Sequence, residues 1–185
     1  MKIIKHSILA LVATISFVSC SDDDTPQVIN EEEVITTMNV TLTSGSQTVT
    51  LTSQDLDGDG PNAPEITVSG NLAANTTYTG NVELLNETES PAENVTEEVE
   101  EENADHQFFF ISTGAIADTD YADVDANGDP VGIDFTLTTG DAGTATLQVI
   151  LRHLPEKDAE GVSDGDITNA NGETDFQAEF EITVE

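Results

Sequence analysis

Residues 175–184 read DFQAEFEITV, and this stretch decides the fold class. Every second residue from Phe176 to Val184 is apolar, and the residues between them are polar or acidic, namely Gln177, Glu179, Glu181 and Thr183. A period of two is typical of a strand that packs one face and exposes the other to water, as strands of antiparallel sheets do. We therefore predict an all-β protein.

The same alternation recurs towards the N-terminus. Segments of this kind, bounded by Gly, Asn, Asp and Ser, predict strands at 34–43, 48–53, 65–69, 77–85, 108–112, 132–138 and 144–151. With the last strand this makes about eight strands joined by turns, which indicates a β-sandwich. We expect residues 34–185 to form one antiparallel, immunoglobulin-like sandwich.

An acidic stretch interrupts the strand pattern. In Ser90-Pro91-Ala92-Glu93, a serine stands at the N-cap, a proline at the first helical position and a glutamate at the capping-box position. A glutamate-rich run follows from Asn94 to Glu102, with apolar residues only at Val95 and Val99. We therefore predict one short acidic surface helix that begins at Ser90.

The first 33 residues predict export and attachment. Residues 1–19 combine Lys2 and Lys5 with an apolar stretch at 8–18, which is the pattern of a signal peptide and is too short to span a membrane. The sequence FVSC at 17–20 looks like a lipobox, so we predict a lipoprotein that is lipidated at Cys20. Residues 20–33 form an acidic tether, and SDDD at 21–24 resembles the signal that sends Bacteroidota lipoproteins to the cell surface. We expect a lipid anchor in the outer membrane, on the cell surface or the periplasmic face.

The charge of the chain limits its partners. There are 37 Asp and Glu residues against 4 Lys and Arg, a formal net charge of −33 at pH 7, and only Arg152 and Lys157 are basic after Cys20. Such a surface repels phosphates, so we expect no nucleic-acid partner. It favours cations or basic proteins, although solubility in a saline medium explains the charge equally well.

Two acidic loops have the ligand spacing of a calcium loop. In the first, the carboxylates of Asp55, Asp57 and Asp59 stand at positions one, three and five, and a glycine at position six permits a sharp turn. The twelfth position is Ile66 instead of an acid. A simple Asp-rich turn is therefore the alternative to calcium binding here.

The second loop matches the calcium template more fully. Its candidate ligands are Asp123, Asp125, Asn127, Asp129 and Asp134. Asp134 replaces the usual glutamate at position twelve and falls on the expected strand 132–138. Chance matches are common in so acidic a chain. A third acidic stretch, 164–175, fits no complete template and is expected to be a loop.

His106 and His153 are candidate ligands for zinc or another transition metal, because imidazole nitrogens and carboxylates together suit such ions. They are far apart in the sequence, and a lone histidine at the surface or at a strand end is the commoner case. Calcium is therefore the favoured cofactor and zinc the less favoured one.

The sequence offers little for catalysis. It contains no G-x-S-x-G, H-E-x-x-H, Walker loop or C-x-x-C. Acylation of Cys20 would remove the thiol as a nucleophile. We therefore do not expect an enzyme.

Several segments resemble one family of proteins. They are EEEVITTM at 31–38, DLDGDG at 55–60, LAANTTYTGNVELLNE at 72–87, EVEEENADHQFF at 98–109, LRHLPEKDA at 151–159 and DITNANGETD at 166–175. Over nearly the whole chain they resemble small Bacteroidota lipoproteins that carry the label type 1 periplasmic binding fold superfamily protein. The label implies solute binding. The fold that it names has two α/β lobes of parallel strands, whereas the alternation here predicts antiparallel strands and a single helix.

Two functions follow as hypotheses. The first is a surface or periplasmic binding module that captures a cation or small ligand and serves an outer-membrane receptor. The second is a structural or adhesive surface protein whose loops are stiffened by calcium.

Overall fold

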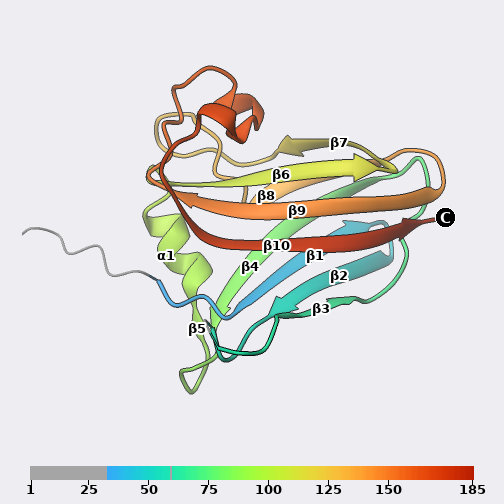
Figure 1. The fold of residues 1–185 in the computed structure, drawn as a ribbon. Coiled ribbons are helices and arrows are strands. Elements are labelled where there is room, and N and C mark those ends of the chain that lie inside the picture. The colour runs from blue at the N-terminus through green and yellow to red at the C-terminus, as the bar shows by residue number, and fades with distance from the viewer. Residues whose placement is uncertain (1–32, 59) are drawn as a thin grey trace, which may run out of the picture. The chain divides into compact units, whose positions relative to one another are not determined.

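Two antiparallel sheets face each other across one apolar core (Figure 1). The computed structural model describes residues 33–58 and 60–185. The larger sheet has the order β3-β2-β1-β4-β8-β7, with β5 paired to β4, and the smaller has the order β10-β9-β6. The all-β sandwich is thereby confirmed. The two sheets have seven and three strands, whereas a constant-type immunoglobulin domain has four and three.

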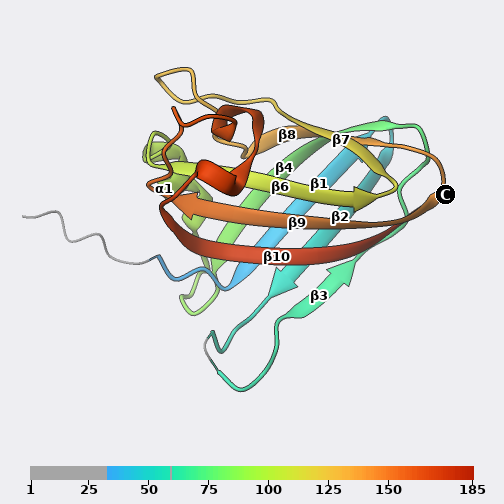
Figure 2. The same cartoon turned by 45° about the horizontal axis from the view of Figure 1, so that its top comes forward.

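The strands agree closely with the expected segments. The larger sheet consists of β1 (Thr37–Ser44), β2 (Gln47–Gln54), β3 (Glu65–Val68), β4 (Thr77–Asn86), β5 (Glu93–Asn94), β7 (Ile116–Tyr121) and β8 (Asp134–Thr139). The smaller sheet consists of β6 (His106–Gly114), β9 (Gly143–His153) and β10 (Glu173–Val184). Figure 2 shows the three strands of the smaller sheet lying across those of the larger one.

The alternation in β10 determines which side chains enter the core. Ala178, Phe180, Ile182 and Val184 are buried, and the residues between them are exposed. The buried side chains pack with inward residues of the larger sheet, including Leu51 and Val82. The inner face of the smaller sheet is therefore apolar along most of its length, and a polar residue on that face is an exception.

The helix begins later than the sequence predicts. Helix α1 runs over Val95–Glu101, and its N-cap is Asn94, whose side chain accepts a hydrogen bond from the Thr96 amide at 3.2 Å. The predicted start at Ser90 is wrong because Glu93 and Asn94 still pair with β4 as the strand β5. The Asn94 side-chain amide also donates to Glu97 Oε1 at 3.5 Å. Val95 and Val99 are buried, as an amphipathic surface helix requires.

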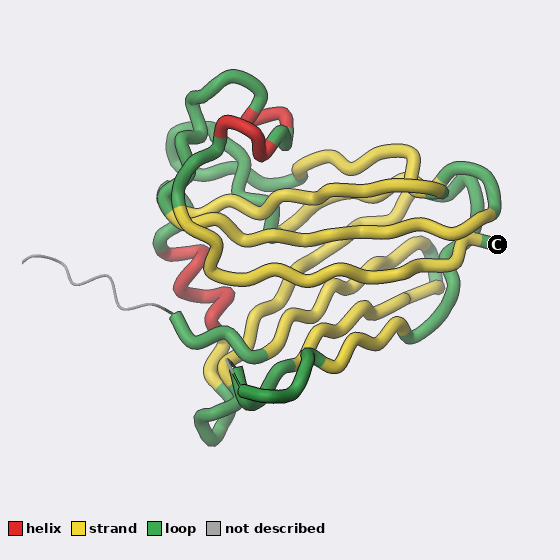
Figure 3. Tube along the Cα trace, in the orientation of Figure 1, coloured by secondary structure: helices red, strands yellow, loops and turns green. Residues whose placement is uncertain are grey.

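The segment between β9 and β10 covers part of the outer face of the smaller sheet. It contains two short 3₁₀ helices, η1 (Val162–Asp164) and η2 (Ile167–Asn169), drawn in red beside the smaller sheet in Figure 3. Val162 and Ala170 pack there on Phe109 and Ile150 in a second apolar cluster. Among the described residues, no helix combines the length and apolarity needed to cross a membrane.

Candidate metal centre

His106 and His153 meet at one end of the smaller sheet. His106 is the first residue of β6, His153 is the last residue of β9, and the two stand directly opposite each other in the antiparallel ladder. Phe108 and Leu151, two residues away on each strand, belong to the main core. The period of two therefore places both histidines on the inner face, where His106 is 1% and His153 8% exposed.

Asp175 reaches the same place through an irregularity in β10. Thr174 pairs with Arg152 and Phe176 pairs with Leu151, so Asp175 is the extra residue of a bulge between these two pairs. A bulge re-aims the side chain at the extra position, and here it turns the carboxylate towards the histidines. The bulge thus gives this corner of the smaller sheet a carboxylate beside the two histidines.

The guanidinium of Arg152 fixes the chain just before this bulge. It donates from Nε to the Asn171 carbonyl at 3.0 Å, from Nη2 to the Gly172 carbonyl at 2.9 Å, and from Nη1 to the Thr174 hydroxyl at 2.5 Å. Nη2 also contacts the Asn171 carbonyl, and four contacts from one planar group leave the turn into β10 little freedom. The position of Asp175 is therefore held from the outer face of the sheet.

The three side chains form a compact set of ligand atoms. Asp175 Oδ2 lies 3.6 Å from His106 Nε2, and Asp175 Oδ1 lies 4.0 Å from His153 Nδ1. One ligand atom from each residue can be chosen so that all lie within 4.8 Å of one another. Both distances are longer than a hydrogen bond. Within the described part of the chain, this is the group of His, Cys, Asp and Glu residues with metal-binding spacing.

The spacing is close to that of a coordinated transition metal. Nitrogen and oxygen ligands lie about 2.0–2.2 Å from zinc, so in a tetrahedral site they are roughly 3.3 Å apart. The separation from Asp175 to His106 would therefore need to shrink by about 0.3 Å and that to His153 by about 0.7 Å. The imidazole rings, however, are stacked, with centroids 4.7 Å apart and planes 10° from parallel. Because each lone pair lies in its ring plane, one ring must turn before both can point at one ion.

A backbone carbonyl orients the ring of His106. Its Nδ1 lies 3.2 Å from the carbonyl oxygen of Glu102, just past the end of α1. A carbonyl only accepts, so Nδ1 carries the proton and Nε2 presents its lone pair to the site. Metal-binding histidines commonly use their second nitrogen in this way.

The protonation state of His106 also suits a ligand. Burial lowers the pKa of its imidazole, the hydrogen bond at the Glu102 carbonyl opposes this, and the neighbouring His153 lowers the pKa further. The net direction is downward, so the ring is neutral at pH 7. Helix α1 has no basic residue in its last turn and ends in consecutive glutamates. The surroundings of the site are thus negative and attract a cation.

Two of the residues expected to bind calcium, Asp123 and Asp125, accept hydrogen bonds from backbone amides of their own loop and its flank. Asp125 Oδ1 accepts the amides of Asn127 and Asp129 at 2.8 and 3.0 Å. Asp123 accepts the amide of Gly132 at 2.6 Å through Oδ1 and that of Asp134 at 3.0 Å through Oδ2. These contacts fold the loop around its own carboxylates.

The ammonium group of Lys157 lies where a cation would meet this loop. Its Nζ donates to Asp125 Oδ2 at 3.0 Å, to the Asn103 carbonyl at 2.7 Å and to the Pro130 carbonyl at 2.9 Å. The Lys157 and Asp125 side chains are 6% and 0% exposed. A lysine therefore supplies the positive charge that the sequence assigned to calcium, and calcium binding at Asp123, Asp125, Asn127, Asp129 and Asp134 stays a prediction.

The first acidic loop connects β2 to β3. Asp57 is exposed, its Oδ2 accepts the Asn62 amide at 2.6 Å, and its own amide faces Asp55 Oδ1 at 3.3 Å. These are the contacts of an Asp-rich turn. Asp59, like the predicted lipid attachment at Cys20 and the tether at 20–32, lies outside the described residues.

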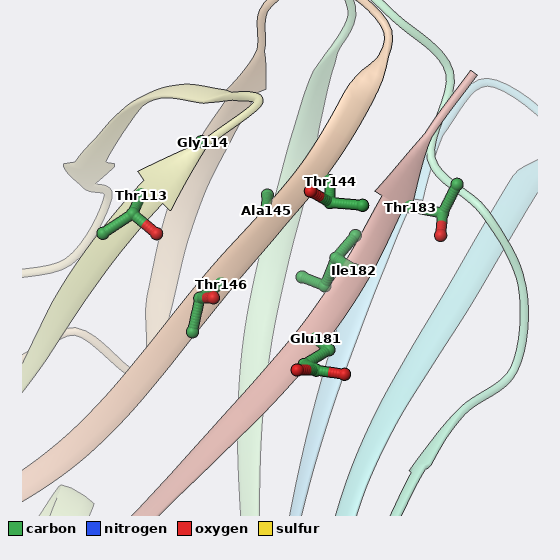
Figure 4. Close-up of a pocket in the computed structure, with 8 residues that line it drawn as sticks. All are labelled: Thr113, Gly114, Thr144, Ala145, Thr146, Glu181, Ile182 and Thr183. Carbon is green, nitrogen blue, oxygen red and sulfur yellow. The ribbon is translucent and has the colours of Figure 1, made fainter.

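A hollow lies at the other end of the smaller sheet. It has a volume of about 440 Å³ and is lined by Thr113, Gly114, Thr144, Ala145, Thr146, Glu181, Ile182 and Thr183 (Figure 4). From His153 to Thr146 is seven residues of β9, or roughly 23 Å. The hollow offers hydroxyl groups and one carboxylate but no imidazole, so it is separate from the metal centre.

No protein-family model, curated protein or solved structure matches this chain. The site is therefore interpreted from its own geometry. The sequence identified two of its three residues but not Asp175. The patterns HQF at 106–108 and LRH at 151–153 could have placed both histidines on the core face, since each histidine is two residues from a core residue. No local signal marks the bulge.

Proposed function

We propose that the protein is a binding module for a divalent transition-metal ion of the zinc class, held by His106, His153 and Asp175. One observation carries this proposal, namely that two buried imidazoles and a carboxylate bring their ligand atoms within 4.8 Å of one another on an otherwise apolar face. Imidazole nitrogen and carboxylate oxygen are atom types that a transition-metal ion binds.

The ligand types favour a transition metal over calcium at this site. Calcium takes six to eight oxygen ligands, whereas imidazole nitrogen suits zinc, copper, iron and nickel. Two of the three ligands here are imidazoles. The geometry thus supports the transition-metal hypothesis for His106 and His153, which the sequence alone ranked below calcium.

The charge and the expected anchor fit capture outside the cell. An acidic surface concentrates cations around the molecule and speeds their encounter with the site. With Cys20 lipidated, the tether would keep the domain at the outer membrane, where it would pass the ion to a receptor. The resemblance to small Bacteroidota lipoproteins and the solute binding implied by their label agree with this role.

A calcium-stiffened structural or adhesive protein is the second candidate. It is supported by a hollow of about 350 Å³ between α1 and the second acidic loop, lined in part by the acidic residues Glu100, Asp123 and Asp134. Extracellular calcium modules bind at roughly 0.1–1 mM, so this role requires only weak affinity. It uses none of the three residues of the metal centre.

Calorimetric titration of residues 21–185 with zinc and with calcium separates the two functions. The metal-capture proposal predicts one zinc site that is lost in His106→Ala and Asp175→Asn and kept in Asp120→Asn, a matched change of an exposed acid on β7. Weak calcium binding without zinc binding would favour the structural role. No heat with zinc in the unaltered domain would refute metal capture.

A further inference from the structure

Strand β10 is the outermost strand of the smaller sheet, and only β9 pairs with it along its length (Figure 2). At its far end, the Leu72 amide donates to the Thr183 carbonyl and the Glu185 amide donates to the Leu72 carbonyl, both at 2.9 Å. In an antiparallel pair, the N–H and the C=O of one residue point to the same side of the strand. The odd-numbered residues of β10 therefore direct their backbone groups away from β9.

Three of these residues have no backbone partner on that side. The register between β10 and β9 is continuous from Phe176 to Val184, so Gln177, Glu179 and Glu181 face the same way as Thr183. None of the described residues bonds to their amides or carbonyls on this side. The middle of β10 is thus an open sheet edge.

The other edges of the two sheets are short, irregular or covered. Strand β3 has four residues, β7 has a bulge beside Ile116, and the Phe108 amide of β6 donates to the Val131 carbonyl at 2.7 Å. Such features protect edge strands, because unpaired backbone groups invite another strand. Strand β10 has 12 residues, and between the bulge at Asp175 and the contact with Leu72 its pairing is regular. This stretch of edge can accept a further strand.

An apolar side chain is left exposed beside this edge. Ile66 and Val68 lie on the inner face of the larger sheet, since they pair with the buried residues Ser53 and Leu51. Strand β3 lies close to β10, and Val68 packs against the main core, whereas Ile66 is 42% exposed. A fourth strand beside β10 would extend the smaller sheet towards β3 and cover Ile66.

The outer side chains of the open edge are acidic and have no positive neighbour on β9. Glu179 and Glu181 are exposed, and the residues paired with them are Gln148 and Thr146. Pairing with β10 of a second copy would bring glutamates together, which opposes such a dimer. A strand with lysine or arginine on its outer face would instead place opposite charges side by side.

We propose that the free edge of β10 binds an extended segment of a partner protein as a fourth strand, with basic residues on its outer face and apolar residues towards Ile66. The backbone groups of Gln177, Glu179 and Glu181 would provide the pairing, and the alternating side chains would provide the specificity. This surface uses none of the three residues of the metal centre, so the inference does not depend on the proposed function.

Titration of residues 21–185 with a synthetic peptide of alternating lysine and valine tests this proposal, since the described residues within that chain contain the complete core. The control peptide has the same side chains and charge but carries a methyl group on each backbone nitrogen. It is attracted equally by the acidic surface but cannot donate to β10. We expect methylation to weaken binding about tenfold or more. Equal affinity for the two peptides would overturn the proposal, because charge alone would then account for binding.

A matched pair of variants tests the edge itself without changing its charge. Gln177→Pro removes an outward amide, which an edge strand tolerates, and Gln177→Ala keeps that amide. We expect Gln177→Pro to weaken peptide binding roughly fivefold or more and Gln177→Ala to change it by no more than about twofold. Melting curves check that both variants are folded. Equal affinity of the two variants would contradict pairing at this edge.

Hydrogen exchange locates the bound peptide. It should slow exchange at the amides of Gln177, Glu179 and Glu181 in the unaltered chain. Absence of binding, or binding without protection of these amides, would overturn the proposal. Slow exchange at the same amides in the free monomer would show that the chain covers its own edge. A dimer that Gln177→Pro abolishes would make a second copy the occupant, and either result would also overturn the proposal.

Discussion

At the scale of single residues, the metal centre joins two stacked imidazoles to a carboxylate that a bulge turns inward. Each of the three is positioned from a different direction. His106 is held by the Glu102 carbonyl, His153 by its place opposite His106 in the ladder, and Asp175 by the turn that Arg152 secures. Under the proposed function, these supports would hold the ligands in place for a metal ion.

Glu33 should make the stability of the metal-free domain depend on pH. Its folded pKa of about 7 is above the ordinary 4.5, so the folded state favours the protonated form. The associated stability is fully present below pH 4.5 and is lost as the pH rises through 7. After allowance for solvent screening of a half-buried group, the loss is roughly 1–2 kcal/mol. Urea unfolding with a chelator at pH 5 and pH 8 should show this loss in the unaltered chain but not in Glu33→Gln. An identical pH dependence in the two chains would contradict the prediction.

The buried pair Asp125–Lys157 should be important for folding. Burial raises the pKa of Asp125, but hydrogen bonds from Lys157, Asp129 and Asn127 outweigh it, so the net pKa lies below the usual range. Asp125→Asn would leave a buried ammonium without its counter-charge, which costs about 3–5 kcal/mol. Chemical denaturation at pH 7 measures this, with exposed Asp158→Asn as the control. Equal midpoints for the two variants would show that the pair contributes nothing.

At the scale of elements, the alternation of apolar and polar residues was enough to predict most of the strands. Strand β7 is the clearest omission, because only Ile116 of its six residues is buried and an edge strand of this kind has no alternation to detect. The histidines were recognised as ligands by residue type, but their meeting depends on the pairing of β6 with β9. Asp175 depends on a bulge, and Lys157 on a contact between segments 32 residues apart. Such long-range register is not encoded in any single window of sequence.

The revised start of α1 can be tested with two substitutions. Asn94→Ala removes the side-chain acceptor for the Thr96 amide and should cost about 1 kcal/mol, the usual effect of losing an N-cap. Ser90→Ala, at the start predicted from sequence, should change stability by less than about 0.5 kcal/mol. Urea unfolding curves provide both values. A larger loss for Ser90→Ala than for Asn94→Ala would place the cap where the sequence first indicated it.

At the scale of the whole molecule, the acidic composition and the metal centre have complementary roles. The formal charge of −33 attracts cations without selecting among them, because carboxylates scattered over a surface bind weakly. Under the proposed function, selection would come from the two imidazoles where β6 begins and β9 ends. If Cys20 anchors the chain, residues 20–33 would determine how far from the membrane this selective site can reach.

The central claim is that His106, His153 and Asp175 hold one transition-metal ion, and imidazole NMR during a zinc titration tests it most directly. Residues 21–185 contain only these two histidines, so their side-chain nitrogen signals are assigned without ambiguity by His106→Ala. We predict that the signals of both rings move together and reach saturation at one equivalent of zinc, with His106 Nε2 as the coordinated atom. Signals that stay unchanged, or a shift in only one ring, would contradict the account.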